Sequence, residues 1–151
     1  MGTPEIVKNF ISMYETLDKD NLHLLRPVYS DDIVFIDALH EVKGLEALET
    51  YFAGMYGNLI SSSIKVTDVQ CSQTEVKDGS GEGVAYMTWS MTYVHPQLAN
   101  KKAISLDGVT KIKYTDKVTY HRDYADMGQM LYEHIPVLGS AIRYIKRRAV
   151  S

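Results

Sequence analysis

The sequence predicts an α+β fold in which helices pack on the concave face of a strongly curved, mixed or antiparallel sheet, forming a cone. Apolar residues follow helical spacing up to Gly57, whereas the chain after Gly57 alternates as strands do. Short glycine- or proline-containing connections join these later stretches, which favours antiparallel neighbours. With 151 residues and 45% hydrophobic content, the chain is predicted to form one domain over residues 1–151.

The N-terminal part predicts two helices and a strand. The first helix is expected from residue 3 to about residue 17, because Pro4 suits the first helical position and apolar residues follow at helical spacing. A second, shorter helix is expected over residues 22–29, where Pro27 must kink or confine it. Residues 33–37 then read as the first strand.

A third helix is predicted over residues 44–57, and four antiparallel strands follow it. The second half of the chain also predicts a bulge between Val66 and Val69, where the alternation slips by one residue. A helical segment is expected from about residue 124 to 133, and a last helix, an extension or lid, over about residues 136–148. The predicted strands cover residues 63–76, 84–94, 103–114 and 117–124.

Composition excludes several classes of function. A net charge of -3 and a pI near 5.9 argue against a general nucleic-acid binder, which needs a basic surface. Cys71 is the only cysteine, so the chain can form no internal disulfide and no cysteine metal cluster. The five histidines show no helical ligand pairing, so neither a metal nor another cofactor is expected. Without a leader-like start or a run of about 20 apolar residues, a cytoplasmic location is expected.

The stretch from Lys117 to Asp126 carries an unusual density of ionisable groups for a strand. Alternation places Tyr120 and Tyr124 on one face and His121 and Asp123 on the other. From this segment alone, two arrangements are open. Either Asp123 is solvated on an exposed face, or the sheet is covered on both sides and Asp123 points with His121 into a cavity.

Three stretches of the sequence make the chain resemble the nuclear transport factor 2-like cone proteins, which include SnoaL-like polyketide cyclases, ketosteroid isomerase and limonene epoxide hydrolase. The stretch from Thr3 through Tyr14 to Asp37 is similar to the start of ketosteroid isomerase. The stretch from Gly83 to Thr110 matches limonene epoxide hydrolase in length between two glycine-containing landmarks. The hexapeptide HRDYAD at residues 121–126 is similar to a motif of limonene epoxide hydrolase. This resemblance implies the cone fold, but such folds carry unrelated chemistries as well as non-catalytic binders.

The resemblance implies roles for three residues. Tyr14 matches the oxyanion-hole tyrosine of ketosteroid isomerase, and Asp37 matches its proton-shuttling aspartate. Asp123 matches the aspartate of limonene epoxide hydrolase that acts on the nucleophilic water.

The sequence also departs from both relatives. Trp89 and Met91 stand where limonene epoxide hydrolase has an arginine and a second aspartate. Thr110, or its neighbour Val109, stands close to where ketosteroid isomerase has a protonated aspartic acid, and Asp107 is expected to face the other way. The complete catalytic set of neither enzyme is therefore present.

The predicted site is an apolar cavity with few polar groups, which is typical of small-molecule sites. Its expected ligand-binding residues are Phe35, Trp89, Met91 and Thr110. Its expected catalytic residues are Asp37, Asp123, Tyr14 and His121.

Two carboxylates in one apolar pocket would raise each other's pKa, so that one could stay protonated while the other acts as a base. The hypothesis is that Asp37 or Asp123 removes a proton or activates water, Tyr14 stabilises an oxyanion, and His121 tunes or relays the proton. Each residue also has a structural interpretation: Tyr14 as a core tyrosine, Asp37 as a turn cap, and His121 as a partner of Asp123.

The expected function is binding of a small hydrophobic organic molecule, and the chemistry expected of a catalytic site here is cofactor-free isomerisation, cyclisation or hydration. The alternative is a non-catalytic ligand-binding or protein-interaction module of the same fold. The hydroxyl-rich sheet face that carries Tyr86, Tyr120 and Tyr124 predicts a homodimer through the sheet. Membrane contact through the basic last helix is not expected, because basic residues near a helix C-terminus also favour the helix dipole.

Overall fold

The computed structural model describes residues 2–72, 82–126 and 138–150. A six-stranded sheet in the order β2-β1-β6-β5-β4-β3 forms its centre. Neighbouring strands pair antiparallel except β1 and β6, which run parallel. The strands are β1 (Tyr29–Ile36), β2 (Glu41–Lys43), β3 (Ser61–Ser72), β4 (Gly83–Val94), β5 (Ile104–Tyr114) and β6 (Val118–Ala125).

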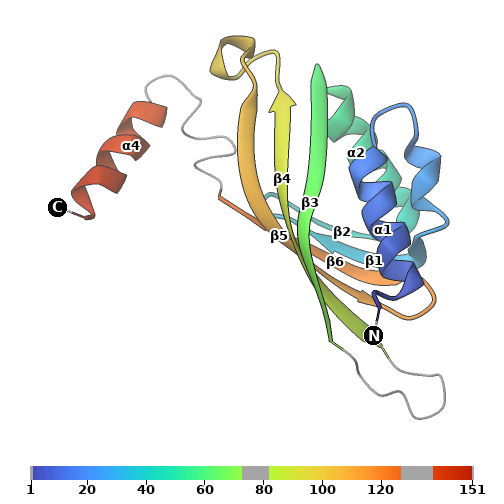
Figure 1. Cartoon of the computed structure of the whole chain (residues 1–151). Coiled ribbons are helices and arrows are strands. Elements are labelled where there is room, and N and C mark those ends of the chain that lie inside the picture. The colour runs from blue at the N-terminus through green and yellow to red at the C-terminus, as the bar shows by residue number, and fades with distance from the viewer. Residues whose placement is uncertain (1, 73–81, 127–137, 151) are drawn as a thin grey trace.

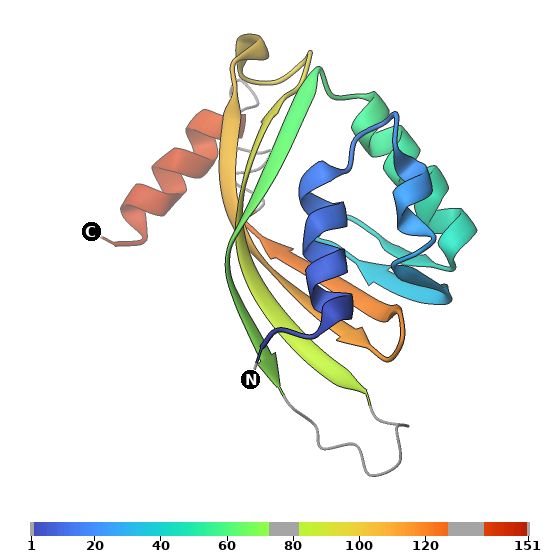
Figure 2. The ribbon, with the colours of Figure 1, turned by 45° about the vertical axis from the view of Figure 1, so that its right-hand side comes forward.

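Helices lie on both sides of this curved sheet (Figure 1). The α1 and α2 helices cover the concave face, whereas α4 lies on the opposite side, apart from the strands (Figure 2). The predicted α+β cone with a C-terminal helix is therefore confirmed. Among the described helices, none has the length and apolar character needed to cross a bilayer. The helices are α1 (Glu5–Thr16), α2 (Leu45–Gly57) and α4 (Leu138–Arg148), with the short 3₁₀ helices η1 (Leu22–Leu25) and η2 (Ala99–Lys101).

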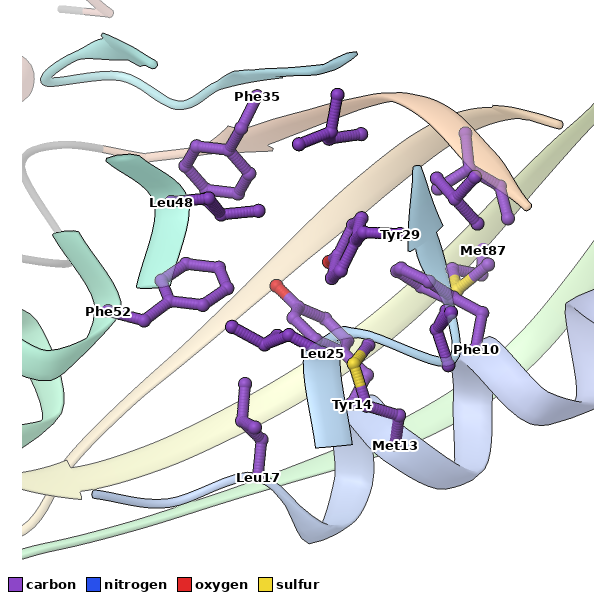
Figure 3. Close-up of a cluster of buried hydrophobic side chains, with 14 of the residues drawn as sticks. Phe10, Met13, Tyr14, Leu17, Leu25, Tyr29, Phe35, Leu48, Phe52 and Met87 are labelled. Atoms are coloured by element: carbon purple, nitrogen blue, oxygen red, sulfur yellow. The ribbon is translucent and has the colours of Figure 1, made fainter. Parts of the chain in front are cut away.

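The core lies between the sheet and the α1 and α2 helices. Each helix buries one apolar stripe, as expected for amphipathic helices that cover a sheet. Figure 3 shows Phe10 and Tyr14 from α1 and Phe52 from α2 in this core, together with Phe35 and Met87 from the sheet. The buried helix residues are Val7, Phe10, Met13 and Tyr14 in α1 and Leu45, Leu48, Phe52 and Tyr56 in α2.

Several predicted elements end differently in the structure. The helix predicted over residues 22–29 is wrong in its second half, because η1 stops at Leu25 and Tyr29 already pairs with β6. Proline at position 27 cannot continue the helix, which agrees with this early end. The three-residue strand β2 was not predicted. The β6 strand runs to Ala125, where a helical segment was expected, and the rest of that segment lies outside the described residues.

The bulge in β3 is confirmed, because the register against β4 shifts between Val66 and Asp68. The Glu15 carboxylate at the end of α1 accepts the Val66 backbone N–H at 2.9 Å, which ties the helix to the bulged strand. The end of the predicted first long strand, residues 73–76, lies outside the described residues.

Candidate functional site

The β6 strand decides between the two arrangements left open for Asp123. The His121 side chain is fully buried, whereas Tyr124 on the other face is 48% exposed. Asp123 keeps 15% of its side chain exposed and faces the same side as His121. The carboxylate therefore lies on the concave face, beneath the helices.

Three side-chain donors hold the Asp123 carboxylate. The Tyr14 hydroxyl on α1 donates to Oδ2 at 3.0 Å. The Thr110 hydroxyl, directly opposite on β5, donates to Oδ1. His121 Nε2 lies 2.7 Å from the same Oδ1. A carboxylate has about four acceptor positions, so one position on Oδ2 is left unfilled by the described residues.

Two further hydrogen bonds bear on the donors that reach Oδ1 of Asp123, whereas Tyr14 donates to Oδ2. The indole N–H of Trp89 can only donate, and it lies 2.8 Å from Thr110 Oγ1, so the Thr110 hydroxyl hydrogen is free to point at Asp123. Tyr29 Oη lies 2.7 Å from His121 Nδ1. When Tyr29 donates to Nδ1, the neutral His121 ring carries its hydrogen on Nε2 and donates it to Asp123.

Burial and the nearby charge keep the phenols of this network protonated. Burial raises the pKa of the Tyr14 phenol well above its usual value, and the charge of Asp123 raises it further. The same two causes, in the same order, raise the pKa of Tyr29. Both hydroxyls thus stay neutral at physiological pH and remain available as hydrogen-bond donors.

Asp37 directly follows β1 and closes the turn to β2. Its Oδ1 accepts the backbone N–H groups of Leu39 and His40, each at 2.8 Å. Its Oδ2 accepts the Tyr51 hydroxyl of α2 at 2.5 Å. Burial, followed by this hydrogen bond and the charge of Asp37, raises the pKa of Tyr51. Asp37 therefore caps a turn, as its structural interpretation predicts, and also keeps one open position on Oδ2.

A cavity of about 100 Å³ lies between the sheet and the two helices. Both carboxylates line it, and aromatic and aliphatic side chains form most of its wall. His121 and Thr110 lie behind Asp123 and are not part of this lining. The lining residues are Tyr14, Phe35, Asp37, Ala38, Leu39, Phe52, Met55, Tyr56, Ile64, Trp89, Met91, Leu106, Asp123 and Ala125.

Most of the predicted site residues thus meet around one cavity. Thr110 and His121 lie behind the lining and hydrogen-bond to Asp123. The predicted residues that line the cavity are Tyr14, Asp37, Asp123, Phe35, Trp89 and Met91. Sequence reasoning missed Tyr29 and Tyr51, which hold His121 and Asp37. Tyr29 stood at the end of a predicted helix, and its partner is 92 positions away, so no local pattern linked the two. Among the described residues, no group of three or more potential ligands could hold a metal ion.

The curved six-stranded sheet with α1 and α2 on its concave face is the nuclear transport factor 2-like fold. The sequence model of the SnoaL-like domain matches residues 10–126, so the chain belongs to this family. A comparison with curated proteins found no match.

Solved structures share the fold at low sequence identity. A protein with a ketosteroid isomerase-like fold from Catenulispora acidiphila, in complex with trimethylamine, has a TM-score of 0.66 and 14% identity, over 86% of this chain and 92% of that one. A putative SnoaL-like polyketide cyclase from Jannaschia sp. CCS1 has a TM-score of 0.65 and 13% identity, over 84% and 92%. An M. tuberculosis LEH-like epoxide hydrolase has a TM-score of 0.61 and 13% identity, over 83% of each chain.

Proposed function

We propose that this protein binds a small, largely apolar organic molecule in the cavity and that Asp123 makes the polar contact through Oδ2. The observation that carries this proposal is the combination of an apolar wall with a carboxylate that retains one open acceptor position. Apolar walls give a ligand its affinity, and a few placed polar groups orient it. A ligand with an N–H or O–H group satisfies both requirements.

The charged side chains that line the cavity favour a small ammonium ion as the ligand. Asp37 and Asp123 face the cavity, and no lysine or arginine is among the described residues that line it. Partly buried carboxylates favour a cationic partner, and aromatic faces such as those of Phe52 and Trp89 attract cations. The structural relative bound to trimethylamine supports this ligand class. A cavity of about 100 Å³ agrees with such a small molecule, since an apolar cavity of roughly 150 Å³ can hold benzene.

The same atom can start acid–base chemistry. Asp123 Oδ2 accepts a proton from the bound molecule or from a water, and the neutral Tyr14 hydroxyl beside it donates to an oxygen that gains negative charge. Isomerisation, cyclisation and hydration are reactions of this type. This catalytic step requires Tyr14 to exchange its hydrogen bond with Asp123 for one with the ligand.

The second candidate is a binding protein without catalysis. One observation favours it. Each carboxylate already accepts three hydrogen bonds, and these bonds stabilise it in the protein without a ligand. If Asp123 only orients a ligand, it can do so without exchanging any of these hydrogen bonds.

Three molecules of the same tetrahedral shape test the binding proposal. The tert-butylammonium ion has a charge and a donor, tetramethylammonium has a charge only, and tert-butanol has a donor only. Trp89, the single tryptophan, lines the cavity and reports occupancy through its fluorescence. We expect tert-butylammonium to bind tightest, by roughly tenfold to a hundredfold over tetramethylammonium, since a hydrogen bond to a charged group contributes about 1.5–3 kcal/mol.

Asp123→Asn is the matched variant. The Asn oxygen should stay with Thr110 and His121, so its NH₂ group faces the cavity and the preference for tert-butylammonium over tetramethylammonium should disappear. A preference that survives Asp123→Asn, or equal affinity for tert-butanol and tert-butylammonium, would contradict the proposal. Exchange of the α-hydrogens of cyclopentanone for deuterium separates the two candidates. Acceleration that depends on Asp123 supports catalysis, and its absence alongside selective binding supports the binding protein.

A further inference from the structure

The indole of Trp89 crosses the neighbouring strand at Gly108. Gly108 on β5 lies opposite Trp89 on β4 and opposite Ala125 on β6. A Cβ atom at Gly108 would lie 2.3 Å from Cζ2 and 2.4 Å from Cη2 of Trp89. The ring therefore occupies the space that any side chain at position 108 would need.

This ring position fixes the direction of the next hydrogen bond. The indole Nε1 lies 2.8 Å from Oγ1 of Thr110, which follows Gly108 on the same face of β5. Because the indole N–H donates to that oxygen, the Thr110 hydroxyl hydrogen turns to Asp123 Oδ1. Trp89 itself is 4% exposed and Thr110 is fully buried, so no solvent competes within this chain of donors.

We propose that Gly108, Trp89 and Thr110 form one positioning unit for Asp123. The missing side chain at Gly108 admits the indole, the indole orients Thr110, and Thr110 holds Oδ1 so that Oδ2 faces the cavity. This inference rests on the proposed function, because it explains how one oxygen of the carboxylate is reserved for the ligand. It adds Gly108 as a residue that sets both the cavity wall and the orientation of the carboxylate.

A readout without any ligand tests the unit. The single tryptophan gives one indole N–H cross-peak in a ¹⁵N–¹H spectrum of the whole protein. Thr110→Val keeps the side-chain shape but removes the hydroxyl, and it should shift this peak, whereas Thr110→Ser should preserve it. Asp123→Asn should also shift the peak in the wild-type background. In the Thr110→Val background, Asp123→Asn should cause little further shift of the indole peak, because coupled residues give non-additive effects.

The probes of the previous section test the consequence for binding. Thr110→Val should lower the preference for tert-butylammonium over tetramethylammonium by roughly threefold to tenfold, which corresponds to one lost hydrogen bond. Thr110→Ser should stay within about twofold of the wild type, because the orienting hydroxyl remains.

Gly108→Ala has a matched control in Gly83→Ala. A Cβ atom at Gly83 would lie 2.4 Å from Cε2 of Tyr114, so both variants press a new methyl group against an aromatic ring. Tyr114 is not among the residues that line the cavity. Gly108→Ala should shift the indole peak and weaken binding of all three probes, whereas Gly83→Ala should leave both unchanged.

The outcomes separate the inference from the proposed function. The positioning unit is overturned if Thr110→Val leaves the position of the indole peak unchanged. It is also overturned if Asp123→Asn shifts the peak equally with and without the Thr110 hydroxyl. A Thr110→Val variant with the wild-type preference among the probes overturns it as well. A wild-type protein without any preference for tert-butylammonium overturns the proposed function, and that result needs no variant.

Discussion

At the scale of single residues, Asp123 is held by hydrogen bonds to Tyr14, Thr110 and His121. The sequence comparison placed Trp89 where an epoxide hydrolase has an arginine, which predicted that the charge partner of the aspartate is lost. The structure confirms Trp89 on the concave face and gives it another connection to the carboxylate, an N–H group that acts through Thr110. Hydroxyl donors such as those of Tyr14 and Thr110 stabilise a carboxylate without adding a positive charge beside it, as an arginine would.

Tyr29→Phe tests the most deeply buried part of this network. The variant leaves Nδ1 of the fully buried His121 without a partner, so we expect the free energy of unfolding at neutral pH to fall by about 1–3 kcal/mol. Urea denaturation measures this change. Tyr124→Phe, on the half-exposed outer face, is the control and should change stability little.

The same variant predicts a pH dependence. Because burial and Asp123 raise the pKa of Tyr29 above its usual 10.0, the unfolded phenol loses its proton first as pH rises. Stability from the neutral phenol is therefore complete below about pH 10 and declines above it. Tyr29→Phe should reduce the slope of stability against pH above pH 10 by up to about 1.4 kcal/mol per pH unit. Identical slopes for the variant and the wild type would contradict this assignment.

At the scale of elements, sequence patterns predicted the pairings between strands that are adjacent in the sequence. The β3–β6 strands pair with their neighbours in sequence, so alternation and connections predicted their order, the bulge and the inward face of Trp89. For Asp123, alternation left two arrangements open, and the inward one was implied only by the family resemblance. The parallel pairing of β1 with β6 joins distant segments, and β2 has three residues, too few for a pattern. The partners that depend on these elements, Tyr29 and Tyr51, therefore could not be predicted.

The turn between β1 and β2 distinguishes the two carboxylates. Asp37→Ala removes the acceptor of two backbone N–H groups and of the Tyr51 hydroxyl, so we expect a loss of about 2 kcal/mol in unfolding free energy. Asp32→Ala, on the exposed side of β1, is the control and should cost less than about 0.5 kcal/mol. Because Asp123 supplies the hydrogen bond, Asp37→Ala should weaken both cationic probes yet keep the preference for tert-butylammonium. Loss of that preference would assign the contact to Asp37.

At the scale of the whole molecule, the outer face of the sheet carries Tyr86, Val109 and Tyr124, exposed by 44%, 36% and 48%. The homodimer through this face stays a prediction. We expect sedimentation equilibrium to give a dimer mass for the wild type and a monomer mass for Val109→Lys, because a charge on each copy would meet its symmetry mate. Ile60→Lys, at an exposed apolar residue before β3, is the control and should leave the mass unchanged. A monomeric wild type would end this prediction.

The parallel pairing of β1 with β6 sets the order in which the hydrogen bonds around Asp123 and His121 can form during synthesis. Tyr14 and Tyr29 leave the ribosome early, but their partners Asp123 and His121 follow 109 and 92 positions later. Contacts between such distant positions form late in folding, because a long loop must close first. A nascent chain that stops before β6 therefore contains most of the core residues and neither of the two side chains that these tyrosines hold.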